Sequence, residues 1–277
     1  MIGLVTDSNA QLPPALLERY GIEVVPLTVT VDGEDHLEGV DLDADAFYAA
    51  FAGGAAPTVS TSQPSPGRFA ATYRRLADAG ADEILSVHIG SAVSGTVNSA
   101  RLGATDSPVP VRVVDTGTAS FGVGCCVWEA AEALRAGAPA EEAAAVAEAL
   151  APSVGNVFVV GALDLVRAGG RLAAGVEAGD GIPVLSLVDG AVQVVGSAAD
   201  VDAAAAVMAG RVRAAGEGLR VAVGIADAAA TPLWQALEAA LAGAPEVAEV
   251  IRYRVGPSVG AHTGPGTAGA FFYPATR

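Results

Sequence analysis

The sequence predicts an α/β protein built from two α/β domains. Short runs of apolar, β-branched residues alternate along the chain with longer segments of helical periodicity. Polar residues follow the expected strand ends, as Asp7 and Ser8 follow the first strand, and a parallel sheet places polar groups at its carboxyl edge in this way. The length of 277 residues suits two domains. We expect an N-terminal domain over residues 1–165, with a parallel sheet flanked by helices, and a C-terminal domain over 166–277, with a mixed sheet and helices.

Turn-forming and helix-starting residues separate the elements of the N-terminal domain. Pro13 and Pro14 stand in the first turn of a helix, where proline is tolerated. Asp43 is placed to cap a helix, and Asp32-Gly33 is a hairpin signal. The expected strands are 2–6, 24–31, 34–37, 84–87, 111–114 and 157–160, and the expected helices begin near 12, 44, 66, 95, 119 and 140.

The C-terminal domain begins after a change in sequence pattern near Gly169-Gly170, where the chain becomes rich in glycine and loses its periodicity. This change places the boundary within 161–181. Two apolar runs on either side of Asp189-Gly190 predict an antiparallel hairpin. The expected elements after the boundary are strands 183–188 and 191–195, helix 201–215, strand 219–225, helix 231–242, and strands 247–255 and 269–273.

Composition and charge argue against several classes of function. The net charge of -16 argues against nucleic-acid binding, which needs clustered basic residues. All 15 basic side chains are Arg, and the absence of Lys excludes a Schiff-base lysine and a Walker-type phosphate loop. The adjacent Cys125 and Cys126 form neither a disulfide framework nor a zinc site. No apolar run reaches the roughly 18 residues of a membrane span, and no signal-peptide pattern is present, so we expect a soluble, cytoplasmic protein.

Two hydroxyl-rich segments at helix starts form the candidate binding site. Ser94, Gly95 and Thr96 follow the strand 84–87 and open the helix expected over 95–104. Free backbone N–H groups and the helix dipole favour an anion at such a position. The segment 58–66, which contains Thr61 and Ser62, also opens a helix and carries no charge. Both segments could bind one carboxylate or phosphate, or both could be ordinary N-caps.

Two glycine-rich motifs match catalytic or cofactor patterns but lack the required context. Gly256-Pro257-Ser258-Val259-Gly260 fits a nucleophile elbow, which also needs a following helix, an acid and a later His. We expect Gly264-Pro265-Gly266 to prevent that helix, and no Asp or Glu follows Glu249. Residues 264–269 fit G-x-G-x-x-G, yet too few residues remain for a crossover helix and strand. We therefore expect no catalytic residue here.

The three histidines have different expected roles, and none has metal-ligand spacing. His36 lies in a polar hairpin and is expected to be exposed. His88 ends an apolar strand and is expected to be a hydrogen-bonded core residue rather than a catalyst. His262 lies among glycines that allow close backbone approach, which makes it a candidate ligand contact. No metal site and no cofactor are expected.

With these residues in view, the chain resembles the DegV family of bacterial fatty-acid-binding proteins. The resemblance covers nearly the whole chain, because several short motifs occur in the family's order. They are Val5-Thr6-Asp7-Ser8, Ile22-Glu23-Val24-Val25-Pro26-Leu27, Thr61-Ser62-Gln63-Pro64-Ser65-Pro66, Ser91-Ala92-Val93-Ser94-Gly95-Thr96, Arg167-Ala168-Gly169-Gly170-Arg171, Ile182-Pro183-Val184-Leu185 and the stretch from Gly256-Pro257 to Gly266.

The resemblance implies that a long-chain fatty acid lies between the two domains, with its tail in an apolar tunnel. Thr61 and Ser94 would bind the carboxylate, together with Ser62, Gly95 and Thr96, and His262 would lie close by. The family has an aliphatic residue at the position of Ser258, which also disfavours a nucleophile there.

Some members of the family present the acyl carboxylate to a separate ATP-binding subunit of a fatty acid kinase. The resemblance implies basic residues at that docking surface, and Arg167 and Arg171 match one such group. A second basic group usually follows the hairpin of the second domain, where this chain has Gly196-Ser197-Ala198-Ala199-Asp200. The kinase subunit is therefore a possible partner, beside simple lipid transport.

Two other classes of function stay open at this point. An enzyme acting on a small anionic metabolite would need a titratable group within reach of a nucleophile, for which His262 and Asp7 are the candidates. A sensor for a sugar or small metabolite would need a polar pocket. A lipid carrier needs neither, and it is the function that we expect.

Overall fold

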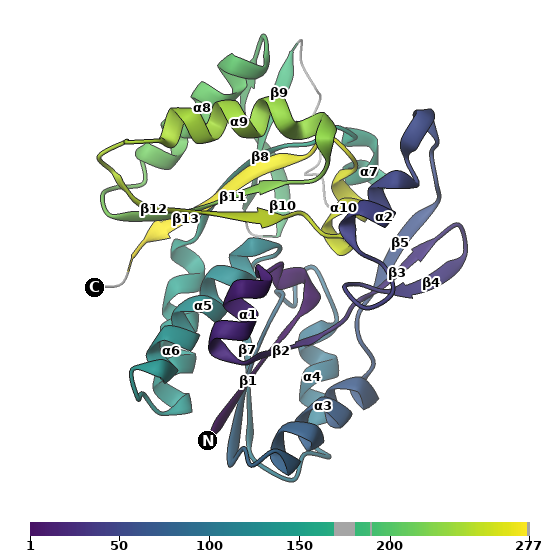
Figure 1. Cartoon of the computed structure of the whole chain (residues 1–277), viewed down its shortest axis with the longest axis vertical. Helices are drawn as coiled ribbons and strands as arrows, with labels where there is room; N and C mark the ends of the chain where they lie inside the picture. The colour runs from purple at the N-terminus through teal and green to yellow at the C-terminus, as the bar shows by residue number, and fades with distance from the viewer. Residues whose placement is uncertain (169–180, 189, 276–277) are drawn as a thin grey trace. The chain divides into compact units, whose positions relative to one another are not determined.

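A computed structural model describes residues 1–168, 181–188 and 190–275 of the chain (Figure 1). The chain divides into two compact units. Unit 1 consists of Met1–Asp41 and Ser60–Pro152, and unit 2 consists of Leu42–Val59 and the chain from Ser153 onward. Each unit contains a sheet covered by helices, which confirms the predicted α/β class. The domain limits predicted from the sequence, 1–165 and 166–277, stay a prediction.

Unit 1 is built on a parallel sheet, as predicted. Its strands lie in the order β2-β1-β6-β7, and all neighbours run parallel. The central strands β1 and β6 are almost entirely buried, which explains their continuous apolar runs. The strand bounds are Ile2–Asp7 for β1, Ile22–Val25 for β2, Glu83–His88 for β6 and Val111–Asp115 for β7.

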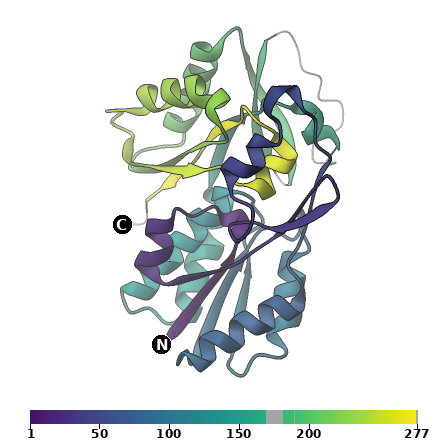
Figure 2. The same ribbon diagram turned by 45° about the vertical axis from the view of Figure 1, so that its right-hand side comes forward.

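Helices cover both faces of this sheet (Figure 2). Phe69 and Tyr73 of α3 and Ala100 of α4 pack with Val5 and Ile84 on one face. Helices α5 and α6 pack against each other and against β6, and α1 lies against α5 and β2. The helix bounds are Pro14–Tyr20 for α1, Pro66–Asp78 for α3, Thr96–Ala104 for α4, Phe121–Arg135 for α5 and Ala140–Leu150 for α6.

The strand predicted over residues 24–31 is wrong in one respect, because it is two strands in different sheets. β2 ends at Val25, and β3 (Thr28–Val31) begins a second, three-stranded sheet with the order β4-β3-β5. Pro26 separates them, since proline has no N–H to donate to a strand ladder. The predicted hairpin is confirmed: β4 (Glu34–Leu37) pairs antiparallel with β3, and Asp32 and Gly33 both have the positive φ that a tight hairpin turn requires.

Unit 2 contains a mixed sheet of six strands in the order β10-β9-β8-β13-β11-β12. β11 and β12 are parallel, whereas the other neighbouring pairs are antiparallel. The predicted hairpin of β9 and β10 is confirmed. The strand bounds are Gly155–Val159 for β8, Ile182–Val188 for β9, Ala191–Ala198 for β10, Leu219–Ile225 for β11, Val247–Arg254 for β12 and Ala268–Pro274 for β13.

The strand predicted over 157–160 does not close the parallel sheet of the first domain. As β8, it runs antiparallel to β13, with Ala268 opposite Val159 and Phe272 opposite Gly155. At its other edge, Asn156 extends the link to β9: its Nδ2 donates to Leu187 O, and Leu187 N donates to its Oδ1. The apolar pattern of a short strand does not say which sheet it joins, and here pairing with the last strand decides it.

Helices α8 (Val201–Arg213) and α9 (Thr231–Leu241) cover one face of this sheet, where Met208 and Leu237 are fully buried. Unit 2 also contains the shorter α-helices α2 (Ala44–Ala49), α7 (Leu163–Ala168) and α10 (Pro257–Thr263). α2 comes from the early segment Leu42–Val59, and it packs against α10. Among the described residues, no helix combines the length and apolar character that a membrane crossing needs.

Candidate functional site

The carboxyl ends of the three strands β1, β6 and β7 bring polar side chains together in unit 1. Asp7 ends β1, His88 ends β6 and Asp115 ends β7, and the sheet register places His88 directly beside Asp115. Asp7 and His88 are fully buried. The loop that leaves β6 at this edge carries Ser94, Gly95 and Thr96, and binding sites in parallel sheets commonly lie at the carboxyl ends of the strands.

Ser94 and Thr96 are adjacent at the start of α4, as predicted. Their hydroxyl oxygens lie 2.8 Å apart, and the Thr96 backbone N–H donates to Ser94 Oγ at 3.3 Å. Gly95 is the N-cap of α4 and is exposed, Ser94 is half-buried and Thr96 is buried. The pair therefore combines a polar, partly accessible oxygen with the electropositive end of a helix.

The second hydroxyl-rich segment is a strand where the sequence predicts a loop. Val59–Ser62 forms β5, in which alternate residues are half-buried and exposed, because side chains of a strand alternate between its faces. Thr61 is half-buried and Ser62 is exposed. Ser65 caps α3 as predicted, since its Oγ accepts from Arg68 N.

Gln63, a residue that no sequence pattern marked as functional, connects the two segments. A Cβ on Gly95 would lie 3.1 Å from Gln63 Cδ, so the Gln63 side chain rests against the start of α4. The chain that follows Thr61 and Ser62 and the chain that follows Ser94 are therefore neighbours within unit 1. The spacing of the motifs along the sequence carried no signal for this contact.

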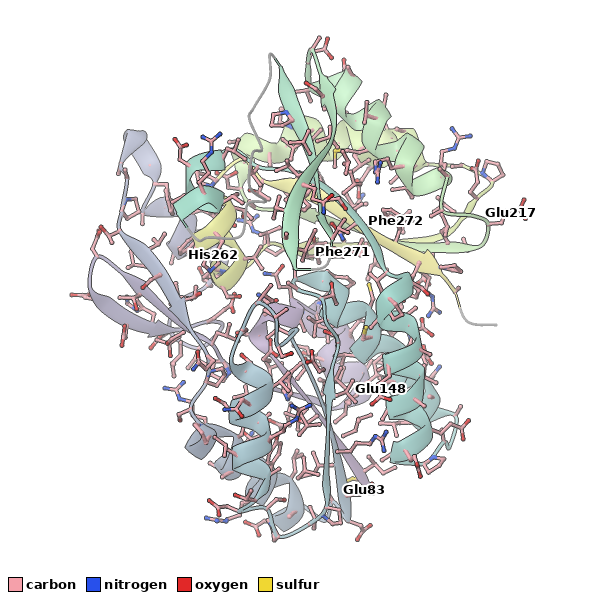
Figure 3. The ribbon with its side chains drawn as sticks, turned by 180° about the vertical axis from the view of Figure 1, so that it is seen from behind. Glu83, Glu148, Glu217, His262, Phe271 and Phe272 are labelled. Atoms are coloured by element: carbon pink, nitrogen blue, oxygen red, sulfur yellow. The ribbon has the colours of Figure 1, made fainter. Side chains whose placement is uncertain are left out.

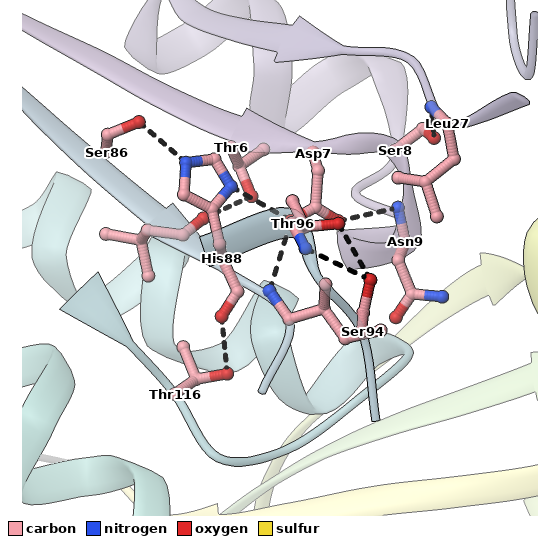
Figure 4. A network of polar contacts seen from close by, with 12 residues as sticks. Thr6, Asp7, Ser8, Asn9, Leu27, Ser86, His88, Ser94, Thr96 and Thr116 are labelled. Carbon is pink, nitrogen blue, oxygen red and sulfur yellow. Dashed lines mark hydrogen bonds and ion pairs between the residues drawn. The ribbon is translucent and has the colours of Figure 1, made fainter. Parts of the chain in front are cut away.

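His88 is a hydrogen-bonded core residue, which confirms the prediction (Figure 4). Its Nδ1 lies 2.9 Å from Asp7 Oδ2, and its Nε2 lies 2.6 Å from Ser86 Oγ. Ser86 Oγ is also 2.8 Å from the Tyr73 hydroxyl. Because a carboxylate only accepts hydrogen bonds, the hydrogen on Nδ1 belongs to the contact with Asp7.

The distances among Ser86, His88 and Asp7 resemble those of a Ser-His-Asp catalytic triad. Unlike a catalytic triad, however, these residues cannot be reached by a substrate. Asp7, Ser86, His88 and Tyr73 are all fully buried. Burial raises the pKa of Tyr73 to about 12, although its hydrogen bond with Ser86 opposes this, so the phenol stays neutral. A nucleophile must reach its substrate, and Ser86 is enclosed by the core. The arrangement is a structural hydrogen-bond chain.

Asp115 is a second carboxylate at this edge of the sheet, and no sequence pattern assigned a role to it. Its Oδ1 accepts from Ser91 N at 3.1 Å and from Gly117 N at 3.0 Å. Burial by itself raises the pKa of this carboxyl, but hydrogen bonds from Ser91 and Gly117 and the charge of Arg101 lower it below the ordinary value of 3.8. Asp115 is therefore ionised at neutral pH and holds the loop after β6.

In unit 2, His262 lies in the last turn of α10 and is half-buried (Figure 3). The expectation of no helix after Gly256 is wrong, because Pro257–Thr263 is helical and ends where Gly264 adopts a positive φ. Proline at the first helical position and glycine after the last one explain these limits. Ser258 is buried in the same helix. The absence of a later acid still disfavours a nucleophile.

The proposed docking residues are only partly described. Arg167 is exposed on α7 and forms an ion pair with Asp164, Nη1 to Oδ1 3.0 Å. Arg171 lies outside the described residues. Where a second basic group was expected, Ala198 is buried at the end of β10, and Asp200 Oδ1 accepts from Ala203 N as the N-cap of α8. This stretch therefore has a structural role of its own.

Within the described part of the chain, no group of three or more His, Cys, Asp or Glu side chains could hold a metal ion. Cys125 and Cys126 are free thiols buried in α5. Burial raises the pKa of both, to about 12 for Cys126, so the thiolate form needed for metal binding or nucleophilic attack is disfavoured.

Comparison with known proteins shows the family of this chain. The family described as "Uncharacterised protein, DegV family" matches residues 1–275. The chain belongs to the DegV family. A DegV domain-containing protein of Streptomyces coelicolor is 37% identical over 273 residues, which cover 97% of this chain and 96% of the relative.

Two solved structures of DegV proteins share this fold over nearly their whole length. A DegV family protein of Thermus thermophilus, described by its fatty acid binding, is 37% identical with a TM-score of 0.86, and 99% of each chain is covered. DegV of Bacillus subtilis, described as a fatty acid binding protein, is 25% identical with a TM-score of 0.87 and the same coverage.

Proposed function

We propose that this DegV protein is a cytoplasmic carrier that binds a long-chain fatty acid and is not an enzyme. The observation that carries the proposal is the likeness over 99% of the chain to the Thermus thermophilus protein, whose description names fatty acid binding. The Ser94–Thr96 hydroxyl pair at the start of α4, with the Thr61 segment as its neighbour, supplies a place for the carboxylate.

The physical chemistry of the ligand supports this assignment of roles. Burying a tail of about fifteen methylenes at roughly 0.8 kcal/mol each contributes on the order of 12 kcal/mol before ordering costs, so the tail dominates affinity. Each hydrogen bond to the carboxylate adds about 1.5–3 kcal/mol. Hydroxyls and helix N–H groups keep a desolvated headgroup satisfied without a buried arginine. Thr61, Ser62, Ser94, Gly95 and Thr96 are the proposed headgroup residues in unit 1, and His262 in unit 2 is a further candidate contact.

Two measurements test the proposal. Denaturing mass spectrometry of the purified protein should find a co-purified fatty acid; a small polar metabolite in its place would favour the enzyme or sensor hypothesis. Calorimetric titration with oleate should then show that Thr61→Ala with Ser94→Ala weakens binding by about tenfold or more. Thr105→Ala is the control, because that exposed hydroxyl donates to Leu102 O at the other end of α4. Unchanged affinity in the double variant, with a native melting curve, would remove these hydroxyls from the site.

Presentation of the bound lipid to a fatty acid kinase subunit is the finer part of this proposal. Two features support it. Arg167 is exposed, and Arg167 and Arg171 match one group of basic residues at the docking surface that the family resemblance implies. Transport without a kinase is the alternative role for the same carrier.

A further inference from the structure

The loop between β6 and α4 carries Ser94, and its backbone is fixed at three consecutive residues. Ile89 N donates to Asp7 Oδ2 at 3.1 Å, Gly90 N donates to Thr118 O at 2.8 Å, and Ser91 N donates to Asp115 Oδ1 at 3.1 Å. Asp7 and Asp115 end the two strands that flank β6. A carboxylate from each side therefore holds the start of this loop.

The restraint at the start of the loop extends to Ser94 through one further hydrogen bond. Ser94 N donates to Gly90 O at 3.1 Å, and Ser94 Oγ in turn meets Thr96. Gly90 packs closely against the backbone of Gly117, since a Cβ at Gly90 would lie 2.6 Å from the Gly117 carbonyl carbon. The position of the Ser94 hydroxyl thus depends on the anchors of Ile89, Gly90 and Ser91.

Asp7 itself has its orientation fixed by buried groups. Its Oδ1 accepts from Asn9 N at 3.1 Å, while Oδ2 receives both Ile89 N and His88 Nδ1. The His88 ring lies edge-on to Phe69, with ring centroids 5.0 Å apart, and its Nε2 on the side away from Asp7 meets Ser86 Oγ. Without the ring, Oδ2 would lose one of its two donors, and the carboxylate would be free to turn away from Ile89.

We propose that Asp7, oriented by His88, and Asp115 are positioning residues of the headgroup site: they hold the loop so that Ser94 meets a carboxylate in a fixed geometry. This inference rests on the proposed function for its ligand but makes a separate claim about the ligand-free loop. None of the three residues needs to touch the ligand. Their effect is to reduce the ordering cost of binding at the headgroup.

The test compares two substitutions of His88. In His88→Asn the side-chain amide can still donate to Asp7, whereas His88→Leu cannot. Ser86→Ala is the matched control, because it removes a buried polar contact of the same ring and leaves the His88–Asp7 contact in place.

The first readout is amide hydrogen exchange in the ligand-free protein. His88→Leu should speed exchange at Ile89 and Ser94 relative to other amides of unit 1, while His88→Asn and Ser86→Ala should leave these two sites near wild type. Equal protection of Ile89 and Ser94 in the wild type and in His88→Leu would overturn the inference, whether or not the protein binds lipid.

The second readout separates the contribution of the headgroup to binding affinity from the contribution of the tail. Oleate and oleyl alcohol share a tail, so the ratio of their affinities reports on the carboxylate contacts. His88→Leu should reduce this ratio by about tenfold, which corresponds to one hydrogen bond to a charged group, and His88→Asn should restore it. A merely structural role would weaken both ligands equally, and that result would also overturn the inference. Failure of the wild type to bind either ligand would instead refute the proposed function.

If His88→Leu does not fold, Asp115→Ala provides the same test from the other side of the loop, because Asp115 is only half-buried and the substitution removes the oxygen that accepts from Ser91 N. It should speed exchange at Ser91 and lower the oleate to oleyl alcohol ratio. Unchanged exchange and an unchanged ratio would count against the positioning role.

Discussion

Gly260 lies where the Tyr48 hydroxyl leaves no space for a side chain: a Cβ on Gly260 would be 2.6 Å from Tyr48 Oη and 2.7 Å from Phe47 Cε1. Both aromatic rings are buried, and the Tyr48 hydroxyl donates to Val255 O at 3.1 Å. An ion pair between Arg254 and Asp45 joins the same two segments. This contact explains how α2, from the first quarter of the chain, is held against the helix that carries His262.

Gly260→Ala should therefore destabilise unit 2, although alanine is the better helix former. Forcing a methyl group into this contact should cost about 1–3 kcal/mol, which exceeds the gain in helix propensity of roughly 1 kcal/mol. Gly210→Ala in α8 is the control, because a Cβ there meets nothing within 4 Å and should be neutral or stabilising. Urea denaturation of both variants measures the difference. A Gly260→Ala protein as stable as Gly210→Ala would contradict the packing described here.

Ionisation of Tyr73 should lower the free energy of unfolding at alkaline pH. Its pKa is about 12 in the folded protein against an ordinary value of 10.0, chiefly because of burial. A group with a raised pKa stabilises the fold fully below its unfolded value and loses that contribution as the pH rises toward the folded value. The wild type should thus lose on the order of 2 kcal/mol between pH 10 and 12 that Tyr73→Phe does not lose.

Thermal unfolding of both proteins across this pH range measures the effect, and absorbance of the tyrosinate band provides an independent check. The late-ionising tyrosine should be missing from the titration of Tyr73→Phe. Identical alkaline profiles for the two proteins would show that Tyr73 ionises normally.

Docking to a kinase subunit should depend on the charge of Arg167. Acyl-phosphate formation with the kinase subunit from the same genome should slow several-fold at low ionic strength in Arg167→Glu, because reversing a rim charge mainly reduces the association rate. The difference should shrink at high salt, where surface charges are screened. Arg211→Glu, at an exposed position on α8, is the control. Turnover unaffected by Arg167→Glu would refute docking at this residue, and no turnover with the wild type would favour transport alone.

Local sequence signals predicted the elements well where the deciding residues are close in the chain. Gly95 and Thr96 start α4, Asp43 caps α2 through Ala46 N, and Asp32-Gly33 turns the β3–β4 hairpin. Each signal acts through contacts within a few residues, so the pattern of the sequence is enough. The prediction failed at Gly256–Gly264 because the glycines after α10 end a short helix and do not prevent it.

Local sequence signals could not predict contacts between residues that are far apart in the chain. β8 joins the unit 2 sheet by pairing with β13, more than a hundred residues later. α2 packs on α10 because Gly260 has no side chain and leaves room for Phe47 and Tyr48. An apolar strand or an amphipathic helix shows that it will be buried, but its partner depends on the register and shape of elements far away in the chain.

The sequence by itself determined the α/β class, the family, and the hydroxyl residues Thr61, Ser94 and Thr96 as headgroup candidates. Only the tertiary structure showed that Gln63 rests against Gly95, and that Asp7 meets His88 across 81 residues of sequence. The physical reason is that a motif fixes which groups are present at a strand end or helix start. Parallel strand pairing then decides which of those groups share one edge of the sheet, and so which of them hold the loop of Ser94.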